Sequence, residues 1–239
     1  MSHARYALSE DEDERIVTRQ AVKEEPVTRI TDERPAIVQL SHAWLNERGS
    51  PELQPWPAEI VDTVLDQLQQ QQSILDSLMS DTSTSEEEHF RLNLVQLDAE
   101  RSKWLLRSFL RTRLEKLEKY ASHLVTNRSE QTRLSPMELG YVKRYDQLLS
   151  DHFQNAVLQY LPEPMRSLND PPPGGSLSNV GSMIVSPQLD SPVFIYCRDD
   201  GGSIVLPDGE SLALLPGSIH LLPYRAIRAV LEQRRVELL

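Results

Sequence analysis

The sequence contains a single cysteine, Cys197, and no long apolar run. One cysteine excludes an intramolecular disulfide and a zinc site built from cysteines, and it fits a reducing compartment. Because no stretch of 18 or more apolar residues is present, we expect no membrane-spanning helix. The first residues also lack the apolar stretch of a secretory signal.

Positive charge is scarce as well. The chain of 239 residues has 25 Lys and Arg against 36 Asp and Glu, which gives a net charge of −11. A protein that binds duplex DNA or RNA on its own needs a basic surface to displace counterions from the phosphates. Autonomous binding to duplex DNA is therefore not expected.

Glycine and proline are missing from the middle of the chain. Only Gly49 and Gly140 precede residue 170, and no proline lies between Pro57 and Pro136. Since these residues interrupt helices and form turns, the pattern predicts an α+β protein in which a helical domain precedes a small β-rich one. We expect a disordered tail at 1–33, an α-helical domain of about five helices at 34–160, a Pro/Gly-rich linker at 161–187 and a β-rich domain at 188–239.

Apolar residues at helical spacing predict the individual helices. The strongest signals are two capping boxes, in which a serine precedes a glutamate by three residues: Ser85 with Glu88, and Ser135 with Glu138. The expected helices cover 35–47, 57–78, 85–120 and 135–160. In the last third, short β-prone runs between turns predict strands at 193–197, 203–206, 211–215, 218–222 and 236–239, with a helix at 224–232.

Local signatures of catalysis and metal binding are absent. The six histidines are scattered singly, no Gly-Lys-Ser/Thr phosphate loop follows Gly174 and Gly175, and no Gly-x-Ser-x-Gly turn occurs. The acidic run at 11–14 lacks the glycine and the terminal glutamate of a calcium loop. We therefore expect no catalytic residues, no metal and no cofactor.

Large apolar residues suggest a role in assembly instead. Trp44, Trp56 and Trp104 lie in or beside helices with wide apolar faces, and a helical domain of this size has limited room to bury them. A surplus of this kind is typical of a permanent helix–helix interface with other chains. Composition alone predicts an acidic, two-part scaffold or adaptor.

Several blocks of sequence resemble the Sld-five subunits of the GINS complex. In the helical part these are AWLNE (43–47), PEL (51–53), EIV (59–61), ER (100–101), SFLRTRLEKLEK (108–119) and LSPMEL (134–139). In the last part they are LDSPVF (189–194), PGSIHL (216–221) and YRAI (224–227). The resemblance covers roughly residues 36–239, with the blocks in the family's order.

The resemblance implies a helical A domain, a linker and a small β-rich B domain. It also implies a non-catalytic structural subunit in a nuclear heterotetramer with three Psf subunits. That tetramer joins the MCM ring and the Cdc-forty-five protein in the CMG replicative helicase. Some family members bind a replisome hub through a short apolar-acidic motif in the N-terminal tail, but no Ile-Leu-x-x-Leu sequence is present at 1–33.

The resemblance also implies residues that contact partner chains. In the helical domain these are Trp44, Trp104, Leu105, Phe109 and Leu110, and in the β-rich domain they are Phe194, Leu221 and Tyr224. Periodicity does not distinguish an interface from a core, so each could instead pack inside the chain. A stand-alone helical regulatory adaptor that binds partner peptides remains the alternative function.

Overall fold

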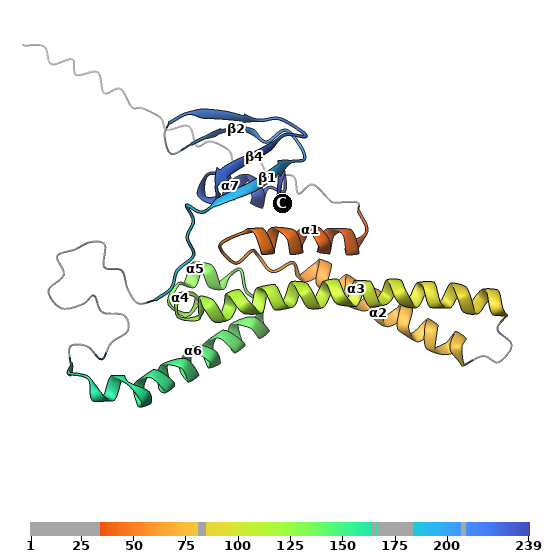
Figure 1. Ribbon diagram of the computed structural model, residues 1–239, viewed down its shortest axis with the longest axis horizontal. Coiled ribbons are helices and arrows are strands. Elements are labelled where there is room, and N and C mark those ends of the chain that lie inside the picture. The colour runs from red at the N-terminus through yellow and green to blue at the C-terminus, as the bar shows by residue number, and fades with distance from the viewer. Residues whose placement is uncertain (1–33, 81–84, 164–165, 167–183, 207–208) are drawn as a thin grey trace, which may run out of the picture. The chain divides into compact units, whose positions relative to one another are not determined.

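The computed structural model describes residues 34–80, 85–163, 166, 184–206 and 209–239 (Figure 1). Within this part of the chain, helices come first and a small β region follows. The helices are α1 (Ala36–Gly49), α2 (Ala58–Met79), α3 (Glu86–Lys119), α4 (Ala121–Thr126), α5 (Arg128–Gln131), α6 (Pro136–Ala156) and the 3₁₀ helix η1 (Leu158–Tyr160). The β region comprises β1 (Pro192–Cys197), β2 (Gly202–Val205), β3 (Ser211–Leu214), β4 (Ile219–Pro223), α7 (Tyr224–Glu232) and β5 (Val236–Leu238). The predicted fold class is confirmed.

Residues 34–239 form one compact unit. The predicted tail at 1–33 and most of the predicted linker at 161–187 lie outside the described residues. The division into helical domain, linker and β-rich domain stays a prediction.

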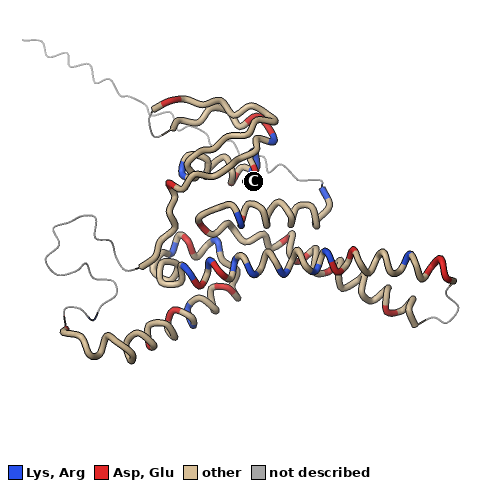
Figure 2. The backbone as a smooth tube through the Cα atoms, viewed as in Figure 1, with Lys and Arg blue, Asp and Glu red and all other residues tan. Residues whose placement is uncertain are grey.

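Both predicted capping boxes are confirmed. The Ser85 hydroxyl accepts a hydrogen bond from the Glu88 backbone N–H, and the Glu88 carboxylate accepts one from the Ser85 N–H. Ser135 and Glu138 make the same two bonds at the start of α6, where Pro136 is the first helical residue. Figure 2 shows acidic residues at the start of α3, where they face the positive end of the helix dipole. Local sequence therefore fixes where α3 and α6 begin.

The helices share two buried apolar clusters. One joins α1 and α2 to α3, and the other joins the end of α3 to α4 and α6. The first contains Leu40, Val61, Val64, Leu68, Ala99, Leu106 and Phe109; the second contains Leu53, Leu117, Tyr120, Ala121, Leu124 and Val142. The long helix α3 is thus the common support of the helical region.

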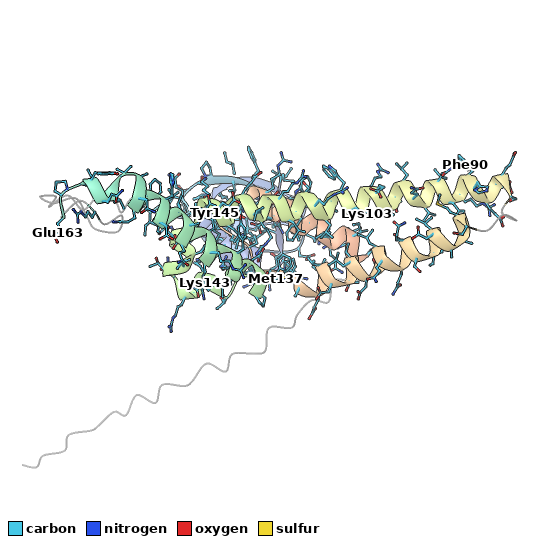
Figure 3. The ribbon with its side chains drawn as sticks, turned by 90° about the horizontal axis from the view of Figure 1, so that it is seen from below. Phe90, Lys103, Met137, Lys143, Tyr145 and Glu163 are labelled. Carbon is cyan, nitrogen blue, oxygen red and sulfur yellow. The ribbon has the colours of Figure 1, made fainter. Side chains whose placement is uncertain are left out.

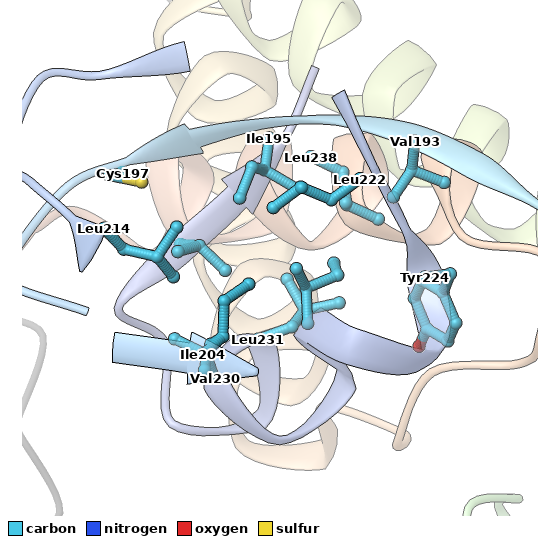
Figure 4. Packing of buried hydrophobic residues seen from close by; sticks show 12 residues of the cluster. Val193, Ile195, Cys197, Ile204, Leu214, Leu222, Tyr224, Val230, Leu231 and Leu238 are labelled. Atoms are coloured by element: carbon cyan, nitrogen blue, oxygen red, sulfur yellow. The ribbon is translucent and has the colours of Figure 1, made fainter. Parts of the chain in front are cut away.

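The β region consists of two small antiparallel sheets and one helix. The first sheet has the strand order β4–β1–β5, and β2 pairs with β3 in the second. In β1, buried side chains alternate with exposed ones. The buried side packs against α7, as Figure 4 shows. Cys197 is part of this core and is fully buried, so its thiol packs as a small apolar group.

A buried arginine connects three helices. The Arg113 guanidinium, on α3, donates to Glu47 Oε2 of α1 at 2.8 Å and to both carboxylate oxygens of Glu138 on α6, at 2.7 and 3.0 Å. It also donates to the carbonyl oxygens of Gln54 and Arg133. Every nitrogen of the guanidinium therefore has an acceptor, as a charge this deeply buried requires.

Lys116 extends this cluster by one helical turn. Its ammonium group donates to Glu47 Oε1 at 2.8 Å and to Ser50 Oγ and the Glu52 carbonyl at 2.9 Å, and it also contacts the Glu47 carbonyl. Burial lowers the pKa of Lys116, and the attraction of Glu47 opposes that effect. Two cations of α3 thus neutralise the buried carboxylate at the end of α1.

Polar contacts also join the helices to the β region. The Tyr224 hydroxyl, at the start of α7, donates to Glu52 Oε1 and accepts from Gln54 Nε2, both at 2.7 Å. Arg133 and Arg228 reach the same Glu52 oxygen at 2.9 and 2.8 Å. Glu52 therefore ties the loop after α1 to both α7 and the segment before α6.

A second set of contacts holds β5 against α1. The Leu238 N–H donates to Asn46 Oδ1 at 2.9 Å, and Glu237 pairs with His42 at 3.0 Å and with Arg198. A Cβ atom at Gly49 would lie 2.9 Å from Leu238 Cβ, so glycine permits this close approach. The β region is small and has a correspondingly small core of its own, and these contacts seat it on α1.

We predict that Arg113→Met strongly destabilises the chain. The methionine fills much of the space but leaves the carboxylates of Glu47 and Glu138 buried without their cation, which costs about 3–5 kcal/mol of unfolding free energy. Urea unfolding followed by circular dichroism measures the change in the free energy of unfolding. The control is Arg111→Met on the exposed side of α3, where little change is expected. Equal effects of the two variants would contradict a central role for Arg113.

We also predict a specific loss of stability at alkaline pH. Burial and the hydrogen bond to Glu52 raise the pKa of Tyr224 above its ordinary value of 10.0. Above about pH 10 the unfolded chain therefore releases this proton while the folded chain keeps it, so stability falls by up to about 1.4 kcal/mol per pH unit. The difference in unfolding free energy between the native chain and Tyr224→Phe should be constant below pH 9 and shrink above pH 10. A difference that stays constant to pH 11 would be contrary evidence.

Candidate protein interface

The structure divides the eight residues predicted to contact partners into three groups. Trp104 (58% exposed), Leu110, Phe194 (56%) and Leu221 (55%) are exposed, Trp44 and Leu105 are partly buried, and Phe109 and Tyr224 (1% each) are buried. The last two side chains belong to the chain's own core. An interface role for the exposed residues stays a prediction.

Trp104 is an exposed aromatic residue in the middle of α3. Its ring stands edge-on against that of Trp44 on α1, with the centroids 5.9 Å apart and the planes at 72°. The guanidinium carbon of Arg48 lies 5.7 Å from the Trp44 ring centroid. Tryptophan and arginine supply a large share of the binding energy at the centres of protein interfaces. This group is therefore a strong candidate for contact with another chain.

Phe109 lies on the covered side of the same helix. Its ring packs against Trp56 with the centroids 6.0 Å apart, and the Arg113 guanidinium carbon lies 5.2 Å from the Trp56 ring centroid. Trp104 and Phe109 are five residues apart, so they point to different sides of α3. The sequence analysis predicted that both contact partner chains, and the packing of α1 and of the loop before α2 decides which of the two is buried.

Apolar exposure continues along the hairpin of α2 and α3. These side chains are Leu65, Ile74, Leu78 and Met79 on α2 and Phe90, Leu94, Val95, Leu97, Trp104, Leu110 and Leu114 on α3. Figure 3 shows Phe90 near the start of α3, far from Tyr145 on α6. Phe90, Leu94 and Leu97 follow one another at helical spacing, and nothing in the described part of the chain covers them.

Helix α6 carries a second exposed apolar surface, which the sequence analysis did not assign to an interface. Its exposed members are Met137, Tyr141, Leu148 and Phe153, followed by Val157 at the end of the helix and Tyr160 of η1. The Tyr141 ring stacks on Tyr145 at 6.1 Å, and its hydroxyl donates to Glu118 at 2.6 Å. That hydrogen bond raises the pKa of Tyr141. The spacing of these residues signals an apolar face, whereas their exposure depends on the position of α6.

A groove between α2 and α3 is lined by polar and charged side chains together with three leucines. Its volume is about 920 Å³, and Lys103 reaches across it to donate to Gln72 Oε1 and Glu100 Oε1, both at 2.9 Å. The hydrogen bond from Lys103 lowers the pKa of Glu100. Lys103 therefore links the two helices, and its ammonium group is engaged in these contacts.

One serine and one histidine form a hydrogen-bonded pair near β4. The Ser218 hydroxyl lies 2.8 Å from His220 Nε2, but it donates its proton to the Leu215 carbonyl at 2.6 Å. The histidine must therefore donate to Ser218, whereas a catalytic base would accept from it. The pair stabilises the turn before β4. No cluster of His, Cys, Asp or Glu suited to a metal ion occurs among the described residues, and none of the helices within them is long and apolar enough to cross a membrane.

Two family models match the chain. The model of the GINS complex protein helical bundle domain matches residues 64–157, and that of the DNA replication complex GINS protein SLD5 C-terminus matches residues 187–239. The first match includes α3 and α6, and the second covers the whole β region.

Curated relatives agree with these matches. DNA replication complex GINS protein SLD5 of Chaetomium globosum is 33% identical over 72% of this chain and 74% of its own. The protein of the same name from Schizosaccharomyces pombe is 31% identical over 85% and 90%, and that from Mus musculus 28% identical over 85% and 88%. The chain thus belongs to the SLD5 family of GINS complex proteins.

Proposed function

We propose that this protein is a non-catalytic structural subunit of a GINS complex that acts in DNA replication in the nucleus. Its partners would be three Psf subunits in a heterotetramer. This tetramer would join the MCM ring and the Cdc-forty-five protein in the CMG helicase and serve initiation and fork progression. Family membership and the name shared by the relatives support this proposal.

The uncovered apolar surface of α2 and α3 is the structural observation that carries the proposal. Monomers rarely leave contiguous apolar patches larger than a few hundred Å² exposed to water. Here Phe90, Leu94, Leu97 and Trp104 are exposed and lie on one side of α3 by helical geometry. Obligate interfaces resemble a protein core cut in half. Helices of other subunits would complete this core.

Assembly also accounts for the titratable groups with shifted pKa values better than catalysis does. Lys116 and Tyr224 are both held by carboxylates that link elements of the fold. Structural ion pairs shift pKa values in the same way as active sites do. The proposed subunit would contribute shape and contacts, and the chemistry of unwinding would reside in other proteins.

We predict that the chain forms one defined complex when it is co-expressed with the three Psf subunits of the same organism. Light scattering on a sizing column should give a single peak at the summed mass of four different chains. The chain alone should self-associate as its concentration rises, because its apolar surface is uncovered. A stable monomer that does not bind the Psf subunits would favour the stand-alone adaptor instead.

We predict that Trp104→Glu blocks assembly without unfolding the chain. A charge at this exposed position would be buried without a partner in the interface, while dilute isolated chain should unfold at nearly the native temperature. The control is Arg111→Glu, which places the same charge at another exposed position of α3. Phe109→Ala should instead destabilise the isolated chain by about 3–5 kcal/mol, because it opens a cavity in the core. Normal assembly of Trp104→Glu would refute a contact there.

A further inference from the structure

Strand β4 lies at one edge of the three-stranded sheet. In an antiparallel pair, the backbone groups of successive residues point alternately toward the partner strand and away from it. The backbone N–H of Cys197 on β1 donates to the Ser218 carbonyl on the β4 side. The Phe194 carbonyl, in contrast, accepts from the Leu239 N–H on the β5 side. Because Phe194 stands opposite Leu221, the N–H and carbonyl of Leu221 point outward. The N–H and carbonyl of Ile219 also point outward, because Ile219 stands opposite Tyr196.

The opposite edge of the sheet, formed by β5, is covered. Leu238 of β5 stands opposite Ile195, so its N–H also points away from β1. There α1 covers the edge, and Asn46 Oδ1 accepts this N–H at 2.9 Å. No strand in the described part of the chain pairs with the outer edge of β4. Among the described residues, α1 thus covers one edge of the sheet and no strand pairs with the other.

The open edge borders an apolar face. Phe194 and Tyr196 of β1 lie opposite Leu221 and Ile219 of β4, and all four side chains are exposed. They point away from the core formed with α7, which contains the intervening residues Val193 and Ile195. An exposed apolar edge strand invites pairing with another chain, and proteins usually protect such edges with charges. Strand β4 contains no lysine, arginine, aspartate or glutamate.

We propose that an extended segment of a sister subunit adds to β4 as a fourth strand and shields the Ile219 and Leu221 side chains of this face. The inference rests on the proposed GINS function. A patch of four side chains measures on the order of a few hundred Å², well below the roughly 800 Å² per partner of a stable interface between folded domains. It fits a strand-sized segment better than a folded domain. Because the edge has no charge to protect it, the cover is permanent, as subunits of one complex provide.

The geometry defines the chemistry of the segment. It offers backbone groups to Ile219 and Leu221, and at alternate positions its apolar side chains pack beside theirs, on the face that they share with Phe194 and Tyr196. Pro223 ends β4 and has no N–H to donate, so the added strand is short. Turn geometry fixes the other end, where Ser218 and His220 are hydrogen-bonded.

Hydrogen exchange of single amides tests this inference. The full chain is measured alone and then in the complex co-expressed with the three Psf subunits. We expect the Ile219 and Leu221 amides to exchange at least about tenfold more slowly in the complex. The His220 and Leu222 amides, which already bond to β1, serve as internal references. Unchanged exchange at Ile219 and Leu221 in an intact complex overturns the inference but leaves the proposed function standing. Failure of the native chain to form the complex overturns both.

Two variants separate strand addition from simple side-chain packing. Leu221→Pro removes an outward N–H but no bond to β1, and proline is tolerated at such edge positions. Leu221→Thr removes a similar apolar side chain but keeps the N–H. We expect Leu221→Pro to weaken assembly at least about tenfold more than Leu221→Thr does. Equal weakening would mean that a partner covers the face without adding a strand. Should Leu221→Pro not fold, the exchange rates of the native chain decide alone.

Discussion

The buried guanidinium of Arg113 holds the helical region together. It balances the carboxylates of Glu47 and Glu138, which come from helices at opposite ends of the helical sequence. Desolvating three charges costs several kcal/mol for each ion, so the cluster is tolerated only because every donor is satisfied. This requirement constrains the positions of α1 and α6 on α3, because a small shift of either helix would leave a charge unpaired. The cluster therefore specifies the arrangement of the helices more than it adds to their stability.

Polar contacts also determine how the β region is placed on the helical region. The apolar cluster there contains residues from β1 to β5 and α7, and among the described residues it does not merge with either cluster of the helical region. Polar contacts connect the two regions, among them the hydrogen bond of Tyr224 to Glu52 and that of Leu238 to Asn46. Hydrogen bonds in a protected environment are directional and costly to leave unmade. They orient the β sheet on α1, which determines which of its edges is covered and which is open.

Local patterns in the sequence predicted most of the fold. The serine–glutamate boxes and the period of the apolar residues located α3 and α6, and the turn residues located the five strands within one or two positions. The short helices α4 and α5 were not anticipated. The helical period also did not reveal which apolar residues are covered, because Phe109 and Leu110 are neighbours and only the packing of α1 and α2 buries one of them. Arg113 was missed for a similar reason: its partner Glu47 lies 66 residues away, and no local signal marks the pair.

The distribution of exposed apolar residues explains why such a fold suits a subunit of a complex. The polar clusters at Arg113 and Glu52 are complete within the chain, so the arrangement of α1, α3, α6 and α7 needs no partner to satisfy its charges. The apolar side chains of Trp104, Phe153 and Leu221 are exposed in the described part of the chain, and they lie on different elements. A chain built in this way can fold first and then bind several neighbours on separate surfaces. Its internal geometry fixes the relative position of those surfaces, and that position is what a structural subunit contributes to an assembly.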